Sequence, residues 1–243
     1  APLNAPGFAG YDATVFTAPL ADPDQYSFQN IRLAVATTLP SLAGSGGTMT
    51  INALNATNNL TFTTATDTLN LASGGFIASA VVGSLSVPGR LTAGGSVVST
   101  GADLYPSRVS SGWGNWYANI VDNPNGTPVR AIYTTLNTGG GWDVFSPANS
   151  YTGGTVLNGF SLRLNGGTIV IPAATDPTQG LIITGNLTGG AQGVLLTADG
   201  QIASSNQVTL SGNGVLNLGG NRQTLAAVRL LNNGGMLPPT VSG

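Results

Sequence analysis

The sequence predicts an all-β protein, specifically a right-handed parallel β-helix (solenoid) with an irregular N-terminal cap or arm and an aromatic-rich insertion. The first supporting observation is composition: 36 of the 243 residues are Gly and only 7% are charged. Typical globular proteins carry about 25% charged residues, so this chain cannot build charged helical surfaces. Its abundant Thr, Val, Gly and Asn favour short strands joined by tight turns.

The second observation is a series of short segments in which apolar and polar residues alternate. They recur roughly every eight to fourteen residues, a spacing that suits a sandwich or barrel as well as a solenoid. Turn motifs with paired glycines favour the solenoid, because its coils of roughly 20 to 25 residues bury their apolar faces only by stacking. The alternating segments are residues 49–51, 60–62, 69–71, 85–87, 162–164, 169–171, 194–196, 208–210, 216–218 and 228–230.

The third observation is the turn motif itself. Residues 149–159 read Asn-Ser-Tyr-Thr-Gly-Gly-Thr-Val-Leu-Asn-Gly, residues 162–169 continue it with another Gly-Gly pair, and residues 208–225 carry a related strand-turn-strand pattern. These segments resemble the passenger-associated transport repeat (autotransporter-associated beta-strand repeat) of secreted bacterial surface proteins. The resemblance covers about the last hundred residues. It implies a β-helix, an extracellular or cell-surface location, and a structural or adhesive role.

The motif residues are expected to act as structural turn residues. Gly153 and Gly154 are expected to supply positive φ at a corner between strand faces. Asn149 is expected to make a turn hydrogen bond or an asparagine ladder, and Tyr151 to cover the corner. In the continuation, Gly166-Gly167 marks the next turn.

Composition also argues against an enzyme. All nine acidic residues are Asp, all seven basic residues are Arg, and the chain contains no His, Cys, Glu or Lys. This removes the usual soft-metal ligands, nucleophile-base pairs and imidazole proton shuttles. We therefore expect no catalytic residues, no metal site and no cofactor. The one enzymatic lead is the spacing of Asp103, Asp122 and Asp143, about one coil apart, as carboxylates of a polysaccharide lyase or hydrolase.

Charge and hydropathy limit the partners. The net charge of −2 and the lack of a basic cluster argue against nucleic acid. No run of about eighteen apolar residues is present, so we expect no membrane insertion of this segment. The N-terminus lacks the pattern of a signal peptide, which we expect to have been removed from an exported protein.

Two segments depart from the repeating pattern. Residues 1–45, rich in proline and aromatic residues, are predicted to be a cap or arm before a β-helix spanning 46–243. Residues 101–147 contain every Trp and are predicted to form an irregular insertion. Clustered aromatics there either pack the insertion as a small core or bind a glycan or partner protein. The candidates for such binding are Trp113, Trp116, Tyr117 and Trp142.

These observations predict a non-enzymatic structural or adhesive β-helical surface protein. A rod so poor in charge lacks the edge charges that block strand-to-strand stacking, so self-association into an extracellular fibre is expected. Glycans or host and cell-surface components are further expected partners. The alternatives are a carbohydrate-binding module that uses the aromatics of residues 101–147, and a polysaccharide lyase or hydrolase.

Overall fold

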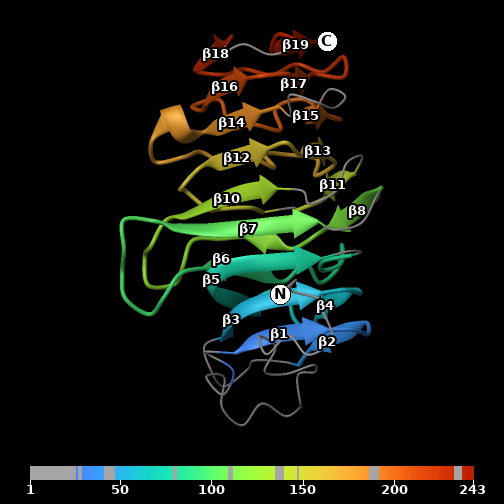
Figure 1. Ribbon diagram of the computed structural model, residues 1–243, viewed down its shortest axis with the longest axis vertical. Helices are drawn as coiled ribbons and strands as arrows, with labels where there is room; N and C mark the ends of the chain where they lie inside the picture. The colour runs from blue at the N-terminus through green and yellow to red at the C-terminus, as the bar shows by residue number, and fades with distance from the viewer. Residues whose placement is uncertain are drawn as a thin grey trace.

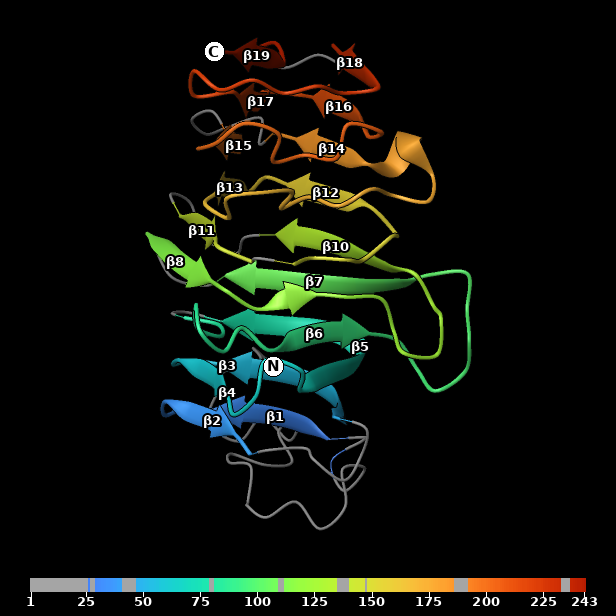
Figure 2. The ribbon, with the colours of Figure 1, turned by 180° about the vertical axis from the view of Figure 1, so that it is seen from behind.

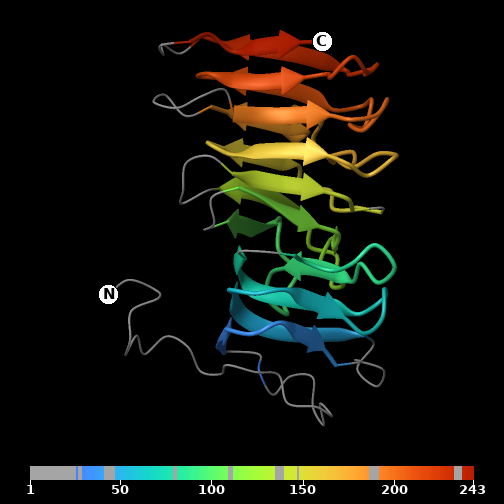
Figure 3. The ribbon, with the colours of Figure 1, turned by 90° about the vertical axis from the view of Figure 1, so that its right-hand side faces the viewer.

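The computed structural model describes residues 26, 29–40, 47–78, 81–108, 112–134, 140–146, 148–185, 192–232 and 237–243. They form a parallel β-solenoid of about eight turns, which confirms the predicted all-β fold. The coils stack along a single long axis, from β1 at one end to β18 and β19 at the other (Figures 1 and 3).

One side of the solenoid is an 11-stranded sheet. Its main path runs β1-β3-β5-β7-β10-β12-β14-β16-β18, and β6 is attached to it by pairing with β5 and β9. Its strands are β1 Asn30–Leu33, β3 Thr48–Ala56, β5 Thr68–Ala78, β6 Arg90–Ala93, β7 Ala102–Arg108, β9 Asn119–Ile120, β10 Val129–Thr134, β12 Thr155–Asn158, β14 Leu181–Thr184, β16 Gln207–Ser211 and β18 Ala227–Leu231.

A second side carries the strand that follows in each coil. Its six-stranded sheet has the order β19-β17-β15-β13-β11-β8, and the pair β2-β4 is joined towards β8 by isolated bridges from Leu60 to Val82 and from Val82 to Trp116. These strands are β2 Thr37–Leu39, β4 Leu60–Phe62, β8 Trp113–Trp116, β11 Gly141–Val144, β13 Ser161–Leu164, β15 Gln192–Leu196, β17 Gly214–Asn217 and β19 Thr240–Ser242.

Alternation along each strand builds the core. In β10, Val129, Ala131 and Tyr133 are buried while the residues between them are half-buried. Because side chains of a strand point alternately to its two faces, the buried set points into the rod and the other set points outward. The register then aligns these residues from coil to coil. For example, Leu181 pairs with Val208, and Val208 pairs with Val228.

The aromatic-rich segment belongs to the stack, which differs from the predicted insertion. Within it, β7 pairs with β5 and β10, while β8 pairs with β11. The physical reason is that its largest side chains fill the interior of the rod and need no separate core. The parts of this region that protrude from the stack are the loops that lead into β7 and β10 (Figures 1 and 2).

The stack of coils already includes residues that we assigned to the N-terminal segment 1–45. β1 pairs with β3, and β2 pairs with β4, so both strands belong to the first coil. The cap or arm predicted for the residues before them falls mainly on 1–25, which lie outside the described residues.

The third side connects the end of each second-sheet strand to the next coil. In the described part of the chain, its only bridge outside the named strands joins Ile171 to Ile202. The side also contains the short 3₁₀ helix η1, Pro177–Gln179. None of the described helical residues forms a helix of the length and hydropathy needed to span a membrane. Backbone hydrogen bonds from the N–H of Ser150 to the O of Ile120 and from the N–H of Ala203 to the O of Ile171 also connect coils on this side.

Candidate functional site

Asn149 of the turn motif connects three successive coils. Its Oδ1 accepts a hydrogen bond from the backbone N–H of Ile120 at 2.8 Å, and its Nδ2 donates to the backbone O of Val170 at 2.7 Å. Ile120 lies one coil before Asn149 and Val170 one coil after it. The side-chain amide thus adds to the backbone bonds between these coils, such as the one from the N–H of Ser150 to the O of Ile120 at 3.0 Å.

The other motif residues are also structural. Tyr151 is fully buried and its hydroxyl contacts Thr155 Oγ1 at 2.7 Å, so it lies inside the corner and does not cover it. Burial raises the pKa of the Tyr151 phenol. Of the expected pair of positive-φ glycines, only Gly154 has one, at +92°. Gly153 serves close approach instead, because a Cβ there would lie 2.6 Å from the backbone of Val129.

The next glycine pair is used through its backbone. Gly166 accepts a hydrogen bond at 2.6 Å from Nε2 of Gln201, which lies in the following coil. The Oε1 of Gln201 accepts from the N–H of Thr197 at 2.9 Å. A Cβ at Gly167 would meet nothing within 4 Å, so that position faces open space.

Further polar side chains connect coils in the same way. Asn206 accepts from the N–H of Ala174 at 3.0 Å and donates to the O of Pro172 at 2.8 Å. Asp122 accepts from the N–H groups of Val129 and Thr152, at 2.7 and 2.9 Å, and from the hydroxyl of Thr152 at 2.7 Å. These side chains are committed to the backbone of neighbouring coils.

Two of the four aromatics predicted to bind a glycan or partner are inaccessible. Trp116 and Trp142 are fully buried, and their rings meet edge to face at 5.3 Å. Trp116 also packs against Phe76 at 5.5 Å. The indole N–H of Trp142 donates to the O of Pro106 at 3.2 Å. These residues form a core cluster, which corrects their assignment as binding residues, because a buried ring cannot stack on a ligand.

The other two candidates reach the surface but already contact a partner. Trp113 is 42% exposed, yet the guanidinium of Arg163 lies 4.4 Å from its ring centroid. Tyr117 stacks on Phe145 with centroids 4.9 Å apart and planes at 19°. A sugar would have to displace these contacts to stack on either ring.

The three aspartates that were candidates for a lyase or hydrolase do not align. The register pairs Asp103 with Arg130, and Asp143 with both Asn115 and Arg163. Asp143 also lies 3.2 Å from Arg163 in an ion pair. The coils here are longer than the spacing of the aspartates, so the three carboxylates occupy different sides of the rod. Among the described residues no group of three or more acidic, His or Cys side chains could hold a metal ion.

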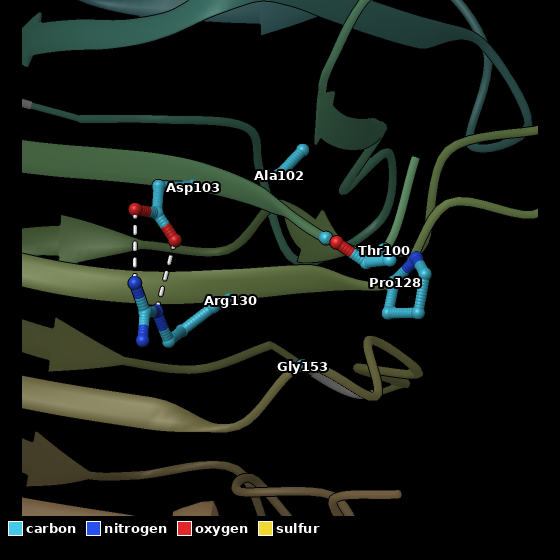
Figure 4. A pocket seen from close by; sticks show the side chains of 7 residues that line it. Thr100, Ala102, Asp103, Pro128, Arg130 and Gly153 are labelled. Carbon is cyan, nitrogen blue, oxygen red and sulfur yellow. Dashed lines mark hydrogen bonds and ion pairs between the residues drawn. The ribbon is translucent and has the colours of Figure 1, made fainter. Parts of the chain in front are cut away.

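A hollow whose lining offers charged groups lies beside β7 and β10. It has a volume of about 330 Å³, and Thr100, Asp103, Arg130 and Gly153 contribute to its lining. Figure 4 shows Asp103 and Arg130 facing each other from neighbouring strands. The guanidinium donates from Nε to Oδ1 at 2.9 Å and from Nη2 to Oδ2 at 3.0 Å.

The environment of this ion pair affects the groups around it. The Tyr105 hydroxyl donates to Asp103 Oδ2 at 3.1 Å. Burial and the neighbouring carboxylate raise the pKa of Tyr105, while the hydrogen bonds to Asp103 raise the pKa of Arg130. The phenol and the guanidinium therefore keep their protons over the physiological pH range.

Sequence reasoning did not select Asp103, Arg130 and Tyr105 as a group. The only signal was an Asp and an Arg about one coil apart, which becomes informative once the coil length is known. Comparison of the chain with protein-family models, curated proteins and solved structures finds no match.

Proposed function

We propose that this chain is a non-enzymatic structural segment of an extracellular or cell-surface protein, a rod that provides length. The observation that carries the proposal is how its polar side chains are used. Asp122, Asn149, Gln201 and Asn206 bind the backbone of neighbouring coils. Groups committed in this way stabilise the stack and are not free to act on a substrate. The repeat resemblance of residues 149–159 supports the surface location.

The C-terminal coil suggests how such a rod associates. Val228, Leu230 and Val241 occupy core positions, yet they are 47%, 53% and 41% exposed. Along the sheets, β18 pairs only with β16, and β19 only with β17. The end of the rod therefore presents apolar side chains together with an unpaired strand edge, a combination that promotes pairing with another chain.

We propose that two copies associate through their C-terminal coils. In the first coil, by contrast, the apolar side chains of Ile31, Leu33 and Leu39 have no exposed surface. A contact between two identical ends is isologous and closes as a dimer. Growth into the expected fibre would require a second surface.

Light scattering coupled to size-exclusion chromatography, over a wide concentration range, tests the association. The 243-residue chain is expected to dimerise with increasing concentration, and Leu230→Asp is expected to remain monomeric. Leu85→Asp is the matched control, because Leu85 is exposed in a loop away from the end. In a longer polypeptide a following coil would take the same place, so the measurement uses this chain. A monomer at every concentration would refute the association.

Small-angle scattering tests the structural role separately, since a rod and a compact particle give different distance distributions. An elongated monomer or dimer is expected. Turnover of a polysaccharide that is lost in Asp143→Asn would contradict the non-enzymatic proposal.

A further inference from the structure

The hollow beside β7 and β10 has the features of a small ligand site. It lies where the exposed loop of residues 95–101 enters β7, next to the corner of the coil that contains Gly153. Its volume of about 330 Å³ is near the lower end of the range for small-molecule sites, roughly 300 to 1,000 Å³. Figure 4 shows the ion pair and Thr100 on the same lining.

The hydrogen-bonding groups of the hollow are only partly used. Arg130 uses Nε and Nη2 to bind Asp103, and its Nη1 has no hydrogen-bond partner among the described residues. The carboxylate oxygens of Asp103 retain lone pairs for further donors, since each can accept more than one hydrogen bond. The side chains of Arg130 and Asp103 are 40% and 31% exposed. Donor and acceptor are therefore offered to the solvent side by side.

The charges of the hollow select the class of ligand. The guanidinium and the carboxylate neutralise each other, so neither an anion nor a cation gains from the site as a whole. A neutral ligand with adjacent hydroxyl groups fits better, because one hydroxyl can accept from Nη1 while its neighbour donates to Asp103. Tyr105 is not among the lining residues, but it places an aromatic ring, 38% exposed, beside the hollow through the bond of its hydroxyl to Asp103.

We propose that Asp103, Arg130 and Tyr105 form a binding site for a neutral saccharide. A sugar ring supplies both requirements: hydroxyl pairs along its edge and an apolar face of C–H groups for the Tyr105 ring. The hydrogen bond from Tyr105 to Asp103 holds the ring next to the carboxylate. The site is independent of the C-terminal coil and of the buried Trp116 and Trp142.

Isothermal titration calorimetry with cellohexaose, laminarihexaose and chitohexaose as neutral probes, and trigalacturonate as an acidic probe, tests the proposal. At least one neutral probe is expected to bind. Arg130→Gln and Asp103→Asn should each weaken that binding at least tenfold. Tyr105→Ala should weaken it as well, whereas Tyr105→Phe, which keeps the ring, should retain most of it.

The chain offers a matched control in its second Asp–Arg pair, in which Asp143 is buried. Arg163→Gln breaks the pair of Asp143 and Arg163 beside Trp113 and should leave binding unchanged. Thermal melting establishes that each variant is folded, and the Tyr105 variants leave both side chains of the ion pair in place, removing from their hydrogen bonds only the hydroxyl bond to Asp103. The proposal is overturned by any of three results: no binding of the neutral probes at millimolar concentration, tighter binding of trigalacturonate, or binding that survives both Arg130→Gln and Tyr105→Ala. None of these results bears on the rod or on the dimer.

Discussion

The first and the last coil of the solenoid contain nearly the same strand in opposite surroundings. In β1, Ile31 and Leu33 flank an Arg and have no exposed surface. In β18, Val228 and Leu230 flank an Arg in the same pattern, yet about half of each side chain is exposed. Both strands stand at an end of the sheet, since β1 pairs with β3 and β18 pairs with β16. The strand pattern therefore sets the direction of each side chain but does not by itself set its burial.

This difference teaches that the coils depend on one another for stability. A single coil cannot cover its own apolar side chains, so the energy of the fold resides in the contacts between coils. The interior coils have neighbours on both sides, while β18 and β19 have one paired strand each and, unlike β1, leave their apolar side chains exposed. Substitutions should therefore cost much less in the last coil than at the equivalent positions elsewhere.

The largest expected effect on stability comes from placing a charge at equivalent positions of β1 and β18. Leu33→Asp would bury an unpaired carboxylate, which costs at least several kcal/mol, and is expected to prevent folding. Leu230→Asp leaves the charge in contact with water, so a change within about 1 kcal/mol is expected. Circular dichroism during thermal denaturation measures both. Equal destabilisation by the two substitutions would contradict the comparison.

The second prediction compares large apolar side chains in the middle and at the end of the rod. Trp116→Ala removes a ring that packs against Phe76 and Trp142, and should cost about 3 to 5 kcal/mol. Leu237→Ala, at a half-exposed position in the last coil, should cost less than about 1 kcal/mol. Urea denaturation gives the free energy of unfolding of both variants. Circular dichroism monitors it for both, and tryptophan fluorescence also monitors it for Leu237→Ala. A loss below about 1 kcal/mol for Trp116→Ala would show that the aromatic cluster is not part of the core.

The third prediction compares two side-chain amides that connect coils. Asn149→Ala would leave the N–H of Ile120 and the O of Val170 without their partner, at a cost of about 2 to 4 kcal/mol. Gln223 binds the N–H and O of Ile202 and the O of the adjacent Thr224, near the last coil, so Gln223→Ala should cost less. Asn158→Ala, at an exposed position of β12, is the control and should be nearly neutral. Urea denaturation measures the free energy of unfolding of the three variants. The loss should be largest for Asn149→Ala, smaller for Gln223→Ala and smallest for Asn158→Ala. The reverse order would contradict the role of Asn149.

The last prediction concerns the loss of stability at alkaline pH that two buried tyrosines of the interior coils should cause. Burial raises the pKa of Tyr133 and of Tyr151 above the ordinary value of about 10. In the unfolded chain both phenols ionise near pH 10, whereas in the folded chain they stay neutral. Stability is therefore fully present below about pH 10 and falls as pH rises further, by about 1.4 kcal/mol per pH unit for each tyrosine.

Thermal melts between pH 8 and 11.5 measure this loss. Tyr133→Phe keeps the ring but removes one titrating group, so its melting temperature should fall less steeply above pH 10. An equally steep fall in that variant would show that Tyr133 does not contribute to the alkaline loss.

The fold could be predicted because its signals are local. Alternating residues at 162–164 and 208–210 appear in the structure as buried and outward positions of β13 and β16. Asn149 was expected to make a turn hydrogen bond or an asparagine ladder, whereas its two backbone partners lie in different coils and could not be inferred without the register. Tyr151 was placed over the corner because local sequence does not show whether a ring points inward.

The hollow, and the choice between core and surface for each aromatic residue, could not be predicted for the same reason. Trp113 and Trp142 both stand near Gly residues in aromatic-rich sequence, yet Trp113 points outward and Trp142 is buried. The pairing of Asp103 with Arg130 depends on the length of the coil between them. A coil length that varies along the chain cannot be read from short-range periodicity.

By itself the sequence determined the type of secondary structure, the stacking of coils and the scarcity of reactive side chains, because composition and alternation act within a few residues. Only the tertiary structure decided which coil lies against which and which polar side chains connect them. It also showed which of two similar strands, β1 or β18, leaves its apolar side chains exposed. The physical reason is that burial and hydrogen bonding between coils depend on residues one coil away, and the register that brings them together is a property of the whole stack.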